Sequence, residues 1–227
     1  MKIGFIGLGK LGLPVALAIE SKGHQVIGTD INDTTLRNIR FKTLNYIEKG
    51  AEELLTKSKI EIKNLDKIVE ESDIIFVPIQ TPHDKKYEGI TRLPEEKADF
   101  NYDYLVKGIK DLNEEIEKQG KDKTVIIIST VLPGTISRPI KPILASHSKL
   151  CYNPYFIAMG TTIDDFLNAE IYLFGVDDVS AAQTAQEFYK TINKAPFFKT
   201  TIEYSELIKV AYNTFISTKI SMINTLM

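Results

Sequence analysis

The chain has 227 residues and a formal net charge of -2, with 28 Lys and Arg against 30 Asp and Glu. This length allows one large domain, or one domain with part of a second, whose core needs no disulfides or structural metals. With 43% hydrophobic and 26% charged residues, the composition excludes a disordered chain and a strongly basic nucleic-acid binder, so a small molecule or another protein is the expected partner.

Short β-branched, apolar runs alternate with amphipathic stretches along the chain. The runs predict strands, most of them buried on both faces, at residues 2–6, 25–29, 74–77, 124–128, 149–152 and 171–174. The stretches between them predict helices at residues 11–22, 34–40, 51–57, 65–70, 104–118, 136–146 and 180–192. This alternation is typical of an α/β fold in which helices cover a mostly parallel sheet, and it extends over residues 1–199.

Two segments interrupt this alternation. Residues 81–102 are rich in charge and contain Pro82, Gly89 and Pro94, which predicts a long loop over a site or a partner surface. Residues 202–227 contain neither Gly nor Pro and keep a helical period, which predicts a helix of roughly 37 Å. Because that helix has no stop signal, we expect residues 200–227 to be the truncated start of a long interdomain helix, in the N-terminal part of a longer protein.

Cys151 is the only cysteine, and His24, His83 and His147 are the only histidines. These counts exclude a disulfide framework and a Cys/His zinc site, and no metal is expected. No apolar stretch approaches about 18 residues, and charged residues interrupt the N-terminal one, so we expect neither a membrane span nor a signal peptide. A cytoplasmic location is therefore predicted.

A glycine-rich sequence directly follows the first predicted strand. It reads Gly7-Leu8-Gly9-Lys10-Leu11-Gly12, and the next residues open an apolar-faced helix. In this setting Gly7 permits the tight turn, Gly9 lets the backbone approach a pyrophosphate, and Gly12 lets the helix pack closely on the strand. The phosphates would lie at the positive end of the helix. The motif predicts a Rossmann-like, doubly wound sheet that binds a dinucleotide.

Asp30 ends the second predicted strand, at about the spacing of 20 residues that this motif requires. A carboxylate there can accept hydrogen bonds from the hydroxyls of an adenosine ribose and would repel a 2′-phosphate. This favours NAD over NADP as the cofactor. The alternative is an aspartate that only forms a turn in a Rossmann-like fold without a nucleotide.

Further motifs follow in order along the chain. Two of them close predicted strands: Phe76-Val77-Pro78-Ile79-Gln80-Thr81-Pro82 and Ser129-Thr130-Val131-Leu132-Pro133-Gly134-Thr135. Asn153-Pro154 follows a third strand, Tyr46-Ile47-Glu48-Lys49-Gly50 precedes a predicted helix, and Lys209 and Asn213 are about one turn apart in the last helix. With these motifs, nearly the whole chain resembles the UDP-glucose/GDP-mannose dehydrogenase family.

The resemblance implies a nucleotide-sugar 6-dehydrogenase that oxidises the C6 alcohol of a UDP-glucose-like sugar to a carboxylate in two hydride transfers to NAD. In this family a cysteine thiolate beyond the long central helix holds the intermediate as a thiohemiacetal and then a thioester. The chain ends before that position, so we expect it to lack the catalytic cysteine and the nucleotide-sugar domain and to be inactive in isolation. The long helix would begin an all-α central domain and mediate a homodimer.

The resemblance also implies cofactor contacts from the carboxyl ends of two strands, the edge at which open α/β sheets bind ligands. Besides the glycine-rich loop and Asp30, the cofactor-binding residues that it implies are Ile79, Gln80, Thr81, Pro82, Ser129 and Thr130. Thr130 would also lie near the reacting carbon, which makes it a candidate catalytic residue. Alternatively, Thr81-Pro82 and Pro133-Gly134 only form turns.

Glu206, Lys209 and Asn213 share one face of the last predicted helix. A polar stripe on the surface is the usual explanation of such spacing. In the family, however, the matching lysine and asparagine lie over the sugar, where the ammonium stabilises developing oxyanion charge and the amide orients water or alkoxide. The resemblance therefore implies that Lys209 and Asn213 bind substrate and act in catalysis.

The chain departs from the family after Asn153-Pro154. The family has a glutamate directly after this pair and another four residues later, whereas this chain has Tyr155 and Met159. Both positions are expected to contact substrate, but methionine cannot accept a proton, and a tyrosine with an ordinary pKa of about 10 is a poor base. Either a divergent enzyme relies on Lys209, Asn213 and an ordered water, or the chemistry is reduced or different.

Two alternatives to a nucleotide-sugar dehydrogenase remain. A β-hydroxyacid or 6-phosphogluconate-type dehydrogenase shares Gly4-Phe5-Ile6-Gly7-Leu8-Gly9 and a Lys-x-x-x-Asn helix, but it lacks the stretch around Asn153-Pro154 and Gly160-Thr161. The other alternative is an NAD-binding module whose catalysis has lapsed and which acts through assembly. Cys151 does not match the family's catalytic cysteine, and we expect it to be a buried small hydrophobe.

Overall fold

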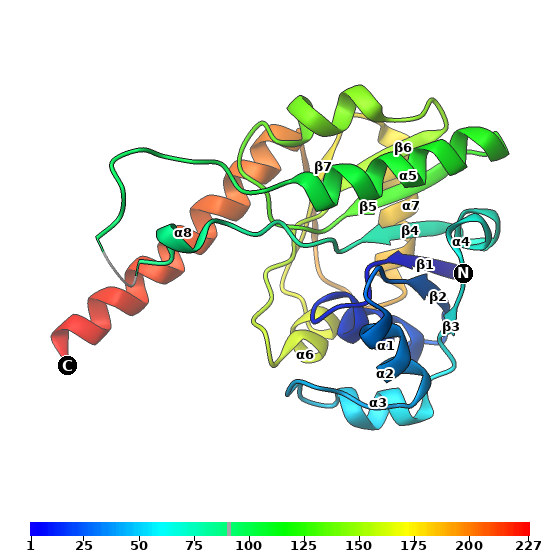
Figure 1. Cartoon of the computed structure of the whole chain (residues 1–227), viewed down its shortest axis with the longest axis horizontal. Helices are drawn as coiled ribbons and strands as arrows, with labels where there is room; N and C mark the ends of the chain where they lie inside the picture. The colour runs from blue at the N-terminus through cyan, green and yellow to red at the C-terminus, as the bar shows by residue number, and fades with distance from the viewer. Residues whose placement is uncertain (90–91) are drawn as a thin grey trace.

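The computed structural model describes residues 1–89 and 92–227, so residues 90 and 91 of the predicted loop at 81–102 lie outside the described residues. Over the described residues, eight strands form one sheet in the order β3-β2-β1-β4-β5-β6-β7-β8 (Figure 1). They are β1 (Lys2–Ile6), β2 (Gln25–Thr29), β3 (Glu61–Ile62), β4 (Ile74–Val77), β5 (Lys123–Ile127), β6 (Ser148–Tyr152), β7 (Tyr172–Val176) and β8 (Phe197–Thr200). Neighbouring strands are parallel except β6 and β7, which are antiparallel.

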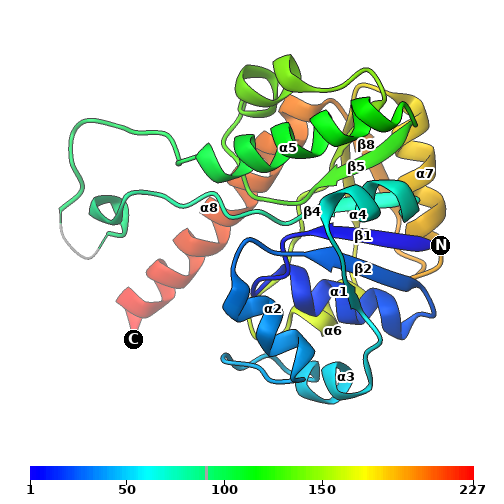
Figure 2. The same cartoon turned by 45° about the vertical axis from the view of Figure 1, so that its right-hand side comes forward.

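Helices cover both faces of this sheet (Figure 2). They are α1 (Gly12–Ser21), α2 (Asp33–Arg40), α3 (Ala51–Lys57), α4 (Leu65–Glu71), α5 (Asp103–Gln119), α6 (Thr162–Leu167), α7 (Val179–Lys190) and α8 (Ile202–Leu226). Short 3-10 helices lie at Lys85–Tyr87 and Lys141–Ile143, and a π-helical turn lies at Ile136–Ile140. Helices α1, α3, α6 and α7 pack on one face of the sheet, while α4, α5 and the start of α8 pack on the other. The fold is a Rossmann-like, doubly wound α/β fold followed by a long helix.

Alternating side chains along the strands divide the core into two apolar layers. In β4, Ile74 and Phe76 belong to the layer of α1 and α7, while Ile75 and Val77 belong to the layer of α4 and α5. All four side chains are fully buried, because a parallel strand with helices on both faces exposes neither side. The continuous apolar run in the sequence therefore identified a central strand.

Helices α2, α7 and α8 begin with a side chain that accepts a hydrogen bond from an amide of the first turn. The acceptors are Asn32 (from Thr34 N, 2.9 Å), Asp178 (from Ser180 N, 2.7 Å) and Thr201 (from Tyr204 N, 3.3 Å). Such caps stabilise a helix by about 1 kcal/mol each. By contrast, no described side chain caps α1, so the amides at its start are available to another acceptor.

The predicted strands and most predicted helices are confirmed, with ends displaced by at most two residues. The helix predicted at 136–146 is wrong: this segment forms a π-helical turn and a 3-10 turn, because Pro139 lacks the amide that an α-helix requires. The sequence prediction also misses β3, β8 and α6. Strand β3 is too short to show a period, and β8 lies at the edge of the sheet with partly exposed residues.

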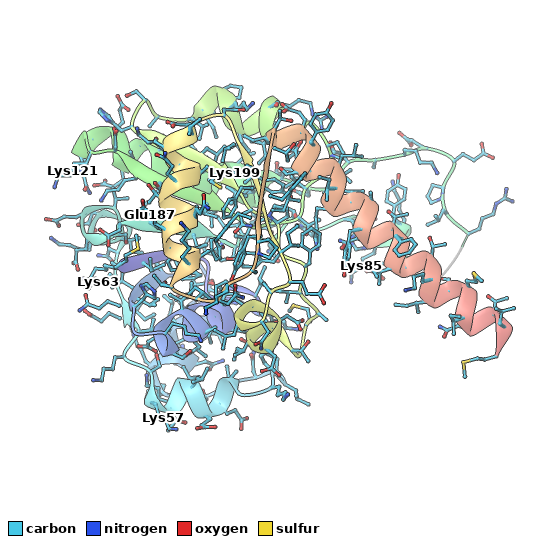
Figure 3. All side chains as sticks on the ribbon, turned by 180° about the vertical axis from the view of Figure 1, so that it is seen from behind. Lys57, Lys63, Lys85, Lys121, Glu187 and Lys199 are labelled. Carbon is cyan, nitrogen blue, oxygen red and sulfur yellow. The ribbon has the colours of Figure 1, made fainter. Side chains whose placement is uncertain are left out.

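Helix α8 extends away from the domain after its first turns (Figure 3). Ile202 and Ser205 are fully buried, and the helix packs so closely on β7 that a Cβ atom on Gly175 would lie 2.0 Å from the Ser205 hydroxyl oxygen. Farther along, apolar side chains such as Phe215 and Met222 are exposed. In residues 1–89 and 92–227, no helix has the length and apolar character that crossing a membrane would require.

Candidate cofactor and substrate site

A pocket of about 980 Å³ lies at the carboxyl ends of β1, β2, β4 and β5. Its volume is at the upper end of the range for small-molecule sites, about 300–1,000 Å³. Most residues predicted to bind the cofactor line this pocket: Gly7, Leu8, Gly9, Lys10, Leu11, Asp30, Ile79, Gln80, Thr81, Ser129 and Thr130. Of the predicted set, Gly12 and Pro82 do not line it. The fold therefore brings the glycine-rich loop and the ends of β2, β4 and β5 to one place.

The three glycines of the loop have different geometries. Gly7 has a φ of 112°, which L side chains rarely adopt, and its amide donates to the Thr29 carbonyl at 2.9 Å. A Cβ atom on Gly12 would lie 2.3 Å from the Gly7 carbonyl oxygen, so this glycine allows α1 to pack against the turn. A Cβ atom on Gly9 would meet no described atom within 4 Å. Gly9 therefore leaves space in the pocket that the chain itself does not fill.

The start of α1 and the carboxylate of Asp30 both border this space. Asp30 accepts hydrogen bonds from the amides of Leu8 (2.7 Å) and Asn32 (2.8 Å), one with each carboxylate oxygen. Each oxygen can accept a further hydrogen bond, as from a ribose hydroxyl. The uncapped amides at the helix start offer positive partial charge to an anion. One part of the pocket thus suits hydroxyl groups and the adjoining part suits phosphate.

Hydroxyl groups join the ends of β4 and β5 to each other. Thr81 donates to the Thr130 carbonyl at 2.6 Å, and the buried Ser129 hydroxyl donates to the Ile79 carbonyl. These hydrogen bonds fix two loops that line the pocket. Since both protons are committed within the protein, Thr81 and Ser129 can offer a ligand only their oxygen lone pairs or backbone groups.

Helix α5 forms a wall of the pocket that the sequence analysis missed. Tyr104, Lys107, Gly108 and Asp111 of this helix line the pocket. A Cβ atom on Gly108 would lie 2.2 Å from the Ile79 Cδ1 atom, so the glycine allows the helix to approach the loop after β4. Gly108 was the signal in the sequence that could have indicated this wall, because a glycine inside an amphipathic helix usually has a packing or functional reason.

Glu206 and Lys209 hold the base of α8 against two loops. Glu206 is fully buried and accepts hydrogen bonds from the amides of Gly134 (2.6 Å) and Ile136 (2.8 Å), while burial raises the pKa of its carboxyl. Lys209 is 6% exposed, and its Nζ atom donates to the Tyr155 carbonyl at 2.6 Å. Burial lowers the pKa of the Lys209 ammonium to about 8. Both side chains make buried contacts, which an exposed polar stripe would not.

The structure separates the predicted catalytic pair from the large pocket. Lys209 and Asn213 are both absent from the residues that line it, whereas Thr130 does line it. Asn213 is exposed on α8, beyond the buried turns of the helix. The joint action of Lys209, Asn213 and Thr130 in catalysis therefore stays a prediction.

Tyr155 lies mostly in the core. Its side chain is 8% exposed, and its hydroxyl shares a hydrogen bond of 2.7 Å with that of Tyr189, which donates in turn to the Asn153 side-chain oxygen. Burial raises the pKa of the Tyr155 hydroxyl well above its ordinary value. Tyr155 also lines a second pocket, of about 580 Å³, with Ile208 and Tyr212 of α8, and its predicted substrate contact stays a prediction. The part of Tyr155 that faces Lys209 is the backbone carbonyl.

Met159 and Cys151 lie in opposite environments. The Met159 side chain is 59% exposed and lines the large pocket, on the loop that leads from β6 to α6. Cys151 is fully buried in β6, and burial raises the pKa of its thiol. A neutral, inaccessible thiol cannot act as a nucleophile, so the expectation of a buried, structural cysteine is confirmed.

Comparison with known proteins agrees with these features. Residues 1–193 match the sequence model of the UDP-glucose/GDP-mannose dehydrogenase family, NAD binding domain. The chain is 26% identical to GDP-mannose 6-dehydrogenase of Pseudomonas aeruginosa, with 99% of this chain and 52% of the relative aligned. It is 28% identical to UDP-glucose 6-dehydrogenase YwqF of Bacillus subtilis, with 99% and 50% aligned. The chain therefore spans about half the length of these relatives.

A solved structure supports the same assignment. The crystal structure of a ternary complex of GDP-mannose dehydrogenase from Pseudomonas aeruginosa superposes with a TM-score of 0.88 at 26% identity, over 99% of this chain and 52% of the other. The overall fold of this chain thus agrees with that of the matched half of the dehydrogenase. The chain belongs to the UDP-glucose/GDP-mannose dehydrogenase family, and residues 1–193 are the NAD-binding domain of that family.

Proposed function

We propose that this chain is the NAD-binding half of a nucleotide-sugar 6-dehydrogenase that oxidises the C6 alcohol of a UDP-glucose-like sugar to a carboxylate. The observation that carries the proposal is the pocket lined by the glycine-rich turn, Asp30 and the loops after β4 and β5. NAD, when bound, supplies the hydride acceptor. The family match favours this function over a β-hydroxyacid or 6-phosphogluconate-type dehydrogenase.

Different residues of the pocket would bind different parts of the cofactor. The amides at the start of α1 would hold the pyrophosphate, with the open space at Gly9 allowing its approach. Asp30 would accept the ribose hydroxyls. The loops that contain Ile79 to Pro82 and Ser129 to Thr130 would orient the rest of the cofactor, since their mutual hydrogen bonds fix their positions.

We also propose a division at residue 199, with 1–199 as the cofactor domain and 200–227 as part of an interdomain helix. Lys209, whose pKa burial lowers to about 8, would interact with the developing negative charge of the sugar alkoxide, and Asn213 would orient the reacting oxygen. The exposed apolar side chains of α8 would pack in a homodimer. The isolated chain should be inactive, because its only thiol is buried at Cys151.

A second function is favoured by one observation. Met159 lies in the pocket where the family has a glutamate, and Tyr155 is bonded inside the core, so neither position offers a carboxylate. A chain that binds NAD but has lost the reaction would fit these two substitutions. This module would still bind the cofactor and would act through assembly.

Calorimetric titration of the chain with NAD, NADP and then UDP-glucose in saturating NAD tests the proposal. We expect NAD to bind more tightly than NADP. The substitution Asp30→Ala should weaken NAD binding by about 1–3 kcal/mol, because it removes the acceptor for the ribose hydroxyls and for the amides of Leu8 and Asn32. Failure of the parent chain to bind NAD would contradict both functions, and an unchanged affinity in the variant would put the adenosine elsewhere. Turnover of UDP-glucose by this chain alone would contradict the inference that the chain lacks the catalytic thiol.

A further inference from the structure

Two segments far apart in the sequence meet at one side of the large pocket. The first precedes α3 and lines the pocket with Asn45 and Tyr46, and the second, after β6, lines it with Met159. Neither segment contains a strand, so the sheet does not fix how they lie relative to each other. Other contacts must hold Met159 at the pocket.

Glu48 makes those contacts. One carboxylate oxygen of Glu48 accepts hydrogen bonds from the Gly160 amide at 3.0 Å and from the Thr162 hydroxyl at 2.9 Å. The next residue adds a backbone link, because the amide of Lys49 donates to the Gly160 carbonyl at 3.0 Å. Glu48 is 6% exposed and Thr162 is fully buried, so water competes little for these hydrogen bonds.

The remaining polar atoms at this place are unusual. In the described residues, the second carboxylate oxygen of Glu48 and the Tyr46 hydroxyl are both buried without a hydrogen-bond partner. Burial, with a further contribution from the nearby Glu48 carboxylate, raises the pKa of the Tyr46 hydroxyl. A buried carboxylate costs free energy unless its hydrogen bonds compensate for lost hydration. An apolar residue would avoid that cost, so the contacts to Gly160 and Thr162 are the evident reason for a glutamate here.

The path of a dinucleotide relates these contacts to the cofactor. An adenosine ribose at Asp30 lies over the end of β2, and the pyrophosphate crosses the turn after β1. The other half of the molecule then lies toward Ser129 and Thr130, after β5. The loop that carries Met159 leaves β6, the strand next to β5. Since Met159 lines the pocket from this loop, the topology favours a contact with the nicotinamide half over one with the adenosine half.

We infer that Glu48 is a positioning residue, which holds the loop from Ala158 to Thr162 so that Met159 packs against the nicotinamide half of the cofactor. The inference rests on the proposed binding of NAD in this pocket. It predicts that loss of the Glu48 contacts weakens the binding of the whole dinucleotide but not of its adenosine half. A general loss of structure would weaken both.

The test compares the affinities of the chain for NAD and for AMP, measured by calorimetry, with thermal unfolding as a check on folding. Glu48→Ala should lower NAD affinity by at least about fivefold, because it leaves the buried Thr162 hydroxyl and the partly buried Gly160 amide unpaired, while AMP affinity stays within about twofold. Glu48→Gln should rescue NAD binding, since its amide oxygen can accept the same two hydrogen bonds. Thr162→Val removes one donor and should lower NAD affinity by a smaller factor.

Asp164→Asn is the matched control. It removes the Lys49–Asp164 ion pair of 2.6 Å, which joins the same two segments at an exposed place, and it should change neither affinity. An unchanged NAD affinity in Glu48→Ala, or an equal loss of NAD and AMP affinity, overturns the inference alone. If Glu48→Ala does not fold, Thr162→Val decides by the same two criteria. A parent chain that binds AMP but not NAD, or binds neither, overturns the proposed function and this inference with it.

Discussion

The glycine-rich turn and the segment after β6 differ in what their residues still provide. At the turn, Gly7 and Gly12 each have a geometric reason for being glycine, and Gly9 leaves space for a ligand. After β6, the backbone is held by hydrogen bonds, but Tyr155 and Met159 offer no carboxylate to the pocket. The turn depends on backbone shape, whereas the segment after β6 differs in its side chains. Substitutions can therefore test the two regions separately.

Substitutions in the turn should give the largest effects. Gly12→Ala places a Cβ atom 2.3 Å from the Gly7 carbonyl oxygen, so the turn must shift, which should lower the free energy of unfolding by about 1–3 kcal/mol. NAD affinity should fall more than about tenfold, because the phosphate-binding amides move with the turn.

Gly9→Ala separates the two effects. Its Cβ atom meets no described atom within 4 Å, so the free energy of unfolding should stay within about 0.5 kcal/mol of the parent. NAD affinity should still fall, since the methyl group takes space needed by the pyrophosphate. Thermal unfolding and NAD titration of both variants provide the measurements. A Gly9→Ala variant with parental NAD affinity would mean that the phosphates do not bind at this turn.

The segment after β6 contacts Lys209 of α8 through the Tyr155 carbonyl, and this buried lysine should make the stability depend on pH. Burial lowers the Lys209 pKa from 10.5 to about 8, so between these values the unfolded chain binds more protons than the folded one. The free energy of unfolding therefore rises with pH in this window, by up to about 2–3 kcal/mol from this group. Below about pH 8 the charged ammonium stays buried and its full cost remains.

Lys209→Met tests this contribution. We expect the difference in the free energy of unfolding between the variant and the parent to change between about pH 8 and 10.5, in the sense that the parent gains stability relative to the variant. Denaturant titrations at several pH values would measure it. A difference that stays constant across this window would show that the ammonium is not desolvated. Burial also lowers the pKa of Lys123, but this residue is present in both proteins, so its contribution cancels in the difference.

Tyr155→Phe should give the smallest effect. It removes the hydrogen bond to the Tyr189 hydroxyl but leaves the bond from Tyr189 to Asn153, so we expect a loss of about 1 kcal/mol in the free energy of unfolding. NAD affinity should not change. Tyr104→Phe, which alters a half-exposed residue of the pocket, serves as the control and should leave stability unchanged. A Tyr155→Phe variant with weaker NAD binding but parental stability would show that the Tyr155 hydroxyl contributes to cofactor binding.

Most residues predicted for the cofactor end of the site line one pocket, because the sequence signals for them are local. The glycine-rich turn and Asp30 belong to consecutive elements, so their spacing alone brings them together. The loops after β4 and β5 could also be predicted, since parallel strands present their carboxyl ends at one edge. These residues line the pocket as a group.

The substrate end could not be predicted in the same way. Whether Tyr155 points into the core depends on Tyr189 of α7, far along the chain, and no pattern around Tyr155 indicates that contact. The direction of β7 is likewise not encoded in its apolar run, because parallel and antiparallel strands can share one period. The α-helix predicted at 136–146 does not form, because Pro139 interrupts a segment with a favourable apolar period.

The antiparallel pairing of β6 and β7 has a topological consequence for this end of the molecule. A chain that links parallel strands must return to the opposite edge of the sheet, which uses most of the connection for the crossing. Here the chain leaves β6 and enters β7 at the same edge, so residues 153–171 never cross the sheet. The exposed residues of that segment, such as Ala158 and Met159, can change while the register of every strand stays the same, whereas Asn153 and Tyr155 are held by buried hydrogen bonds. The exposed loop that carries Met159 can thus change in evolution while the sheet below the pocket stays the same.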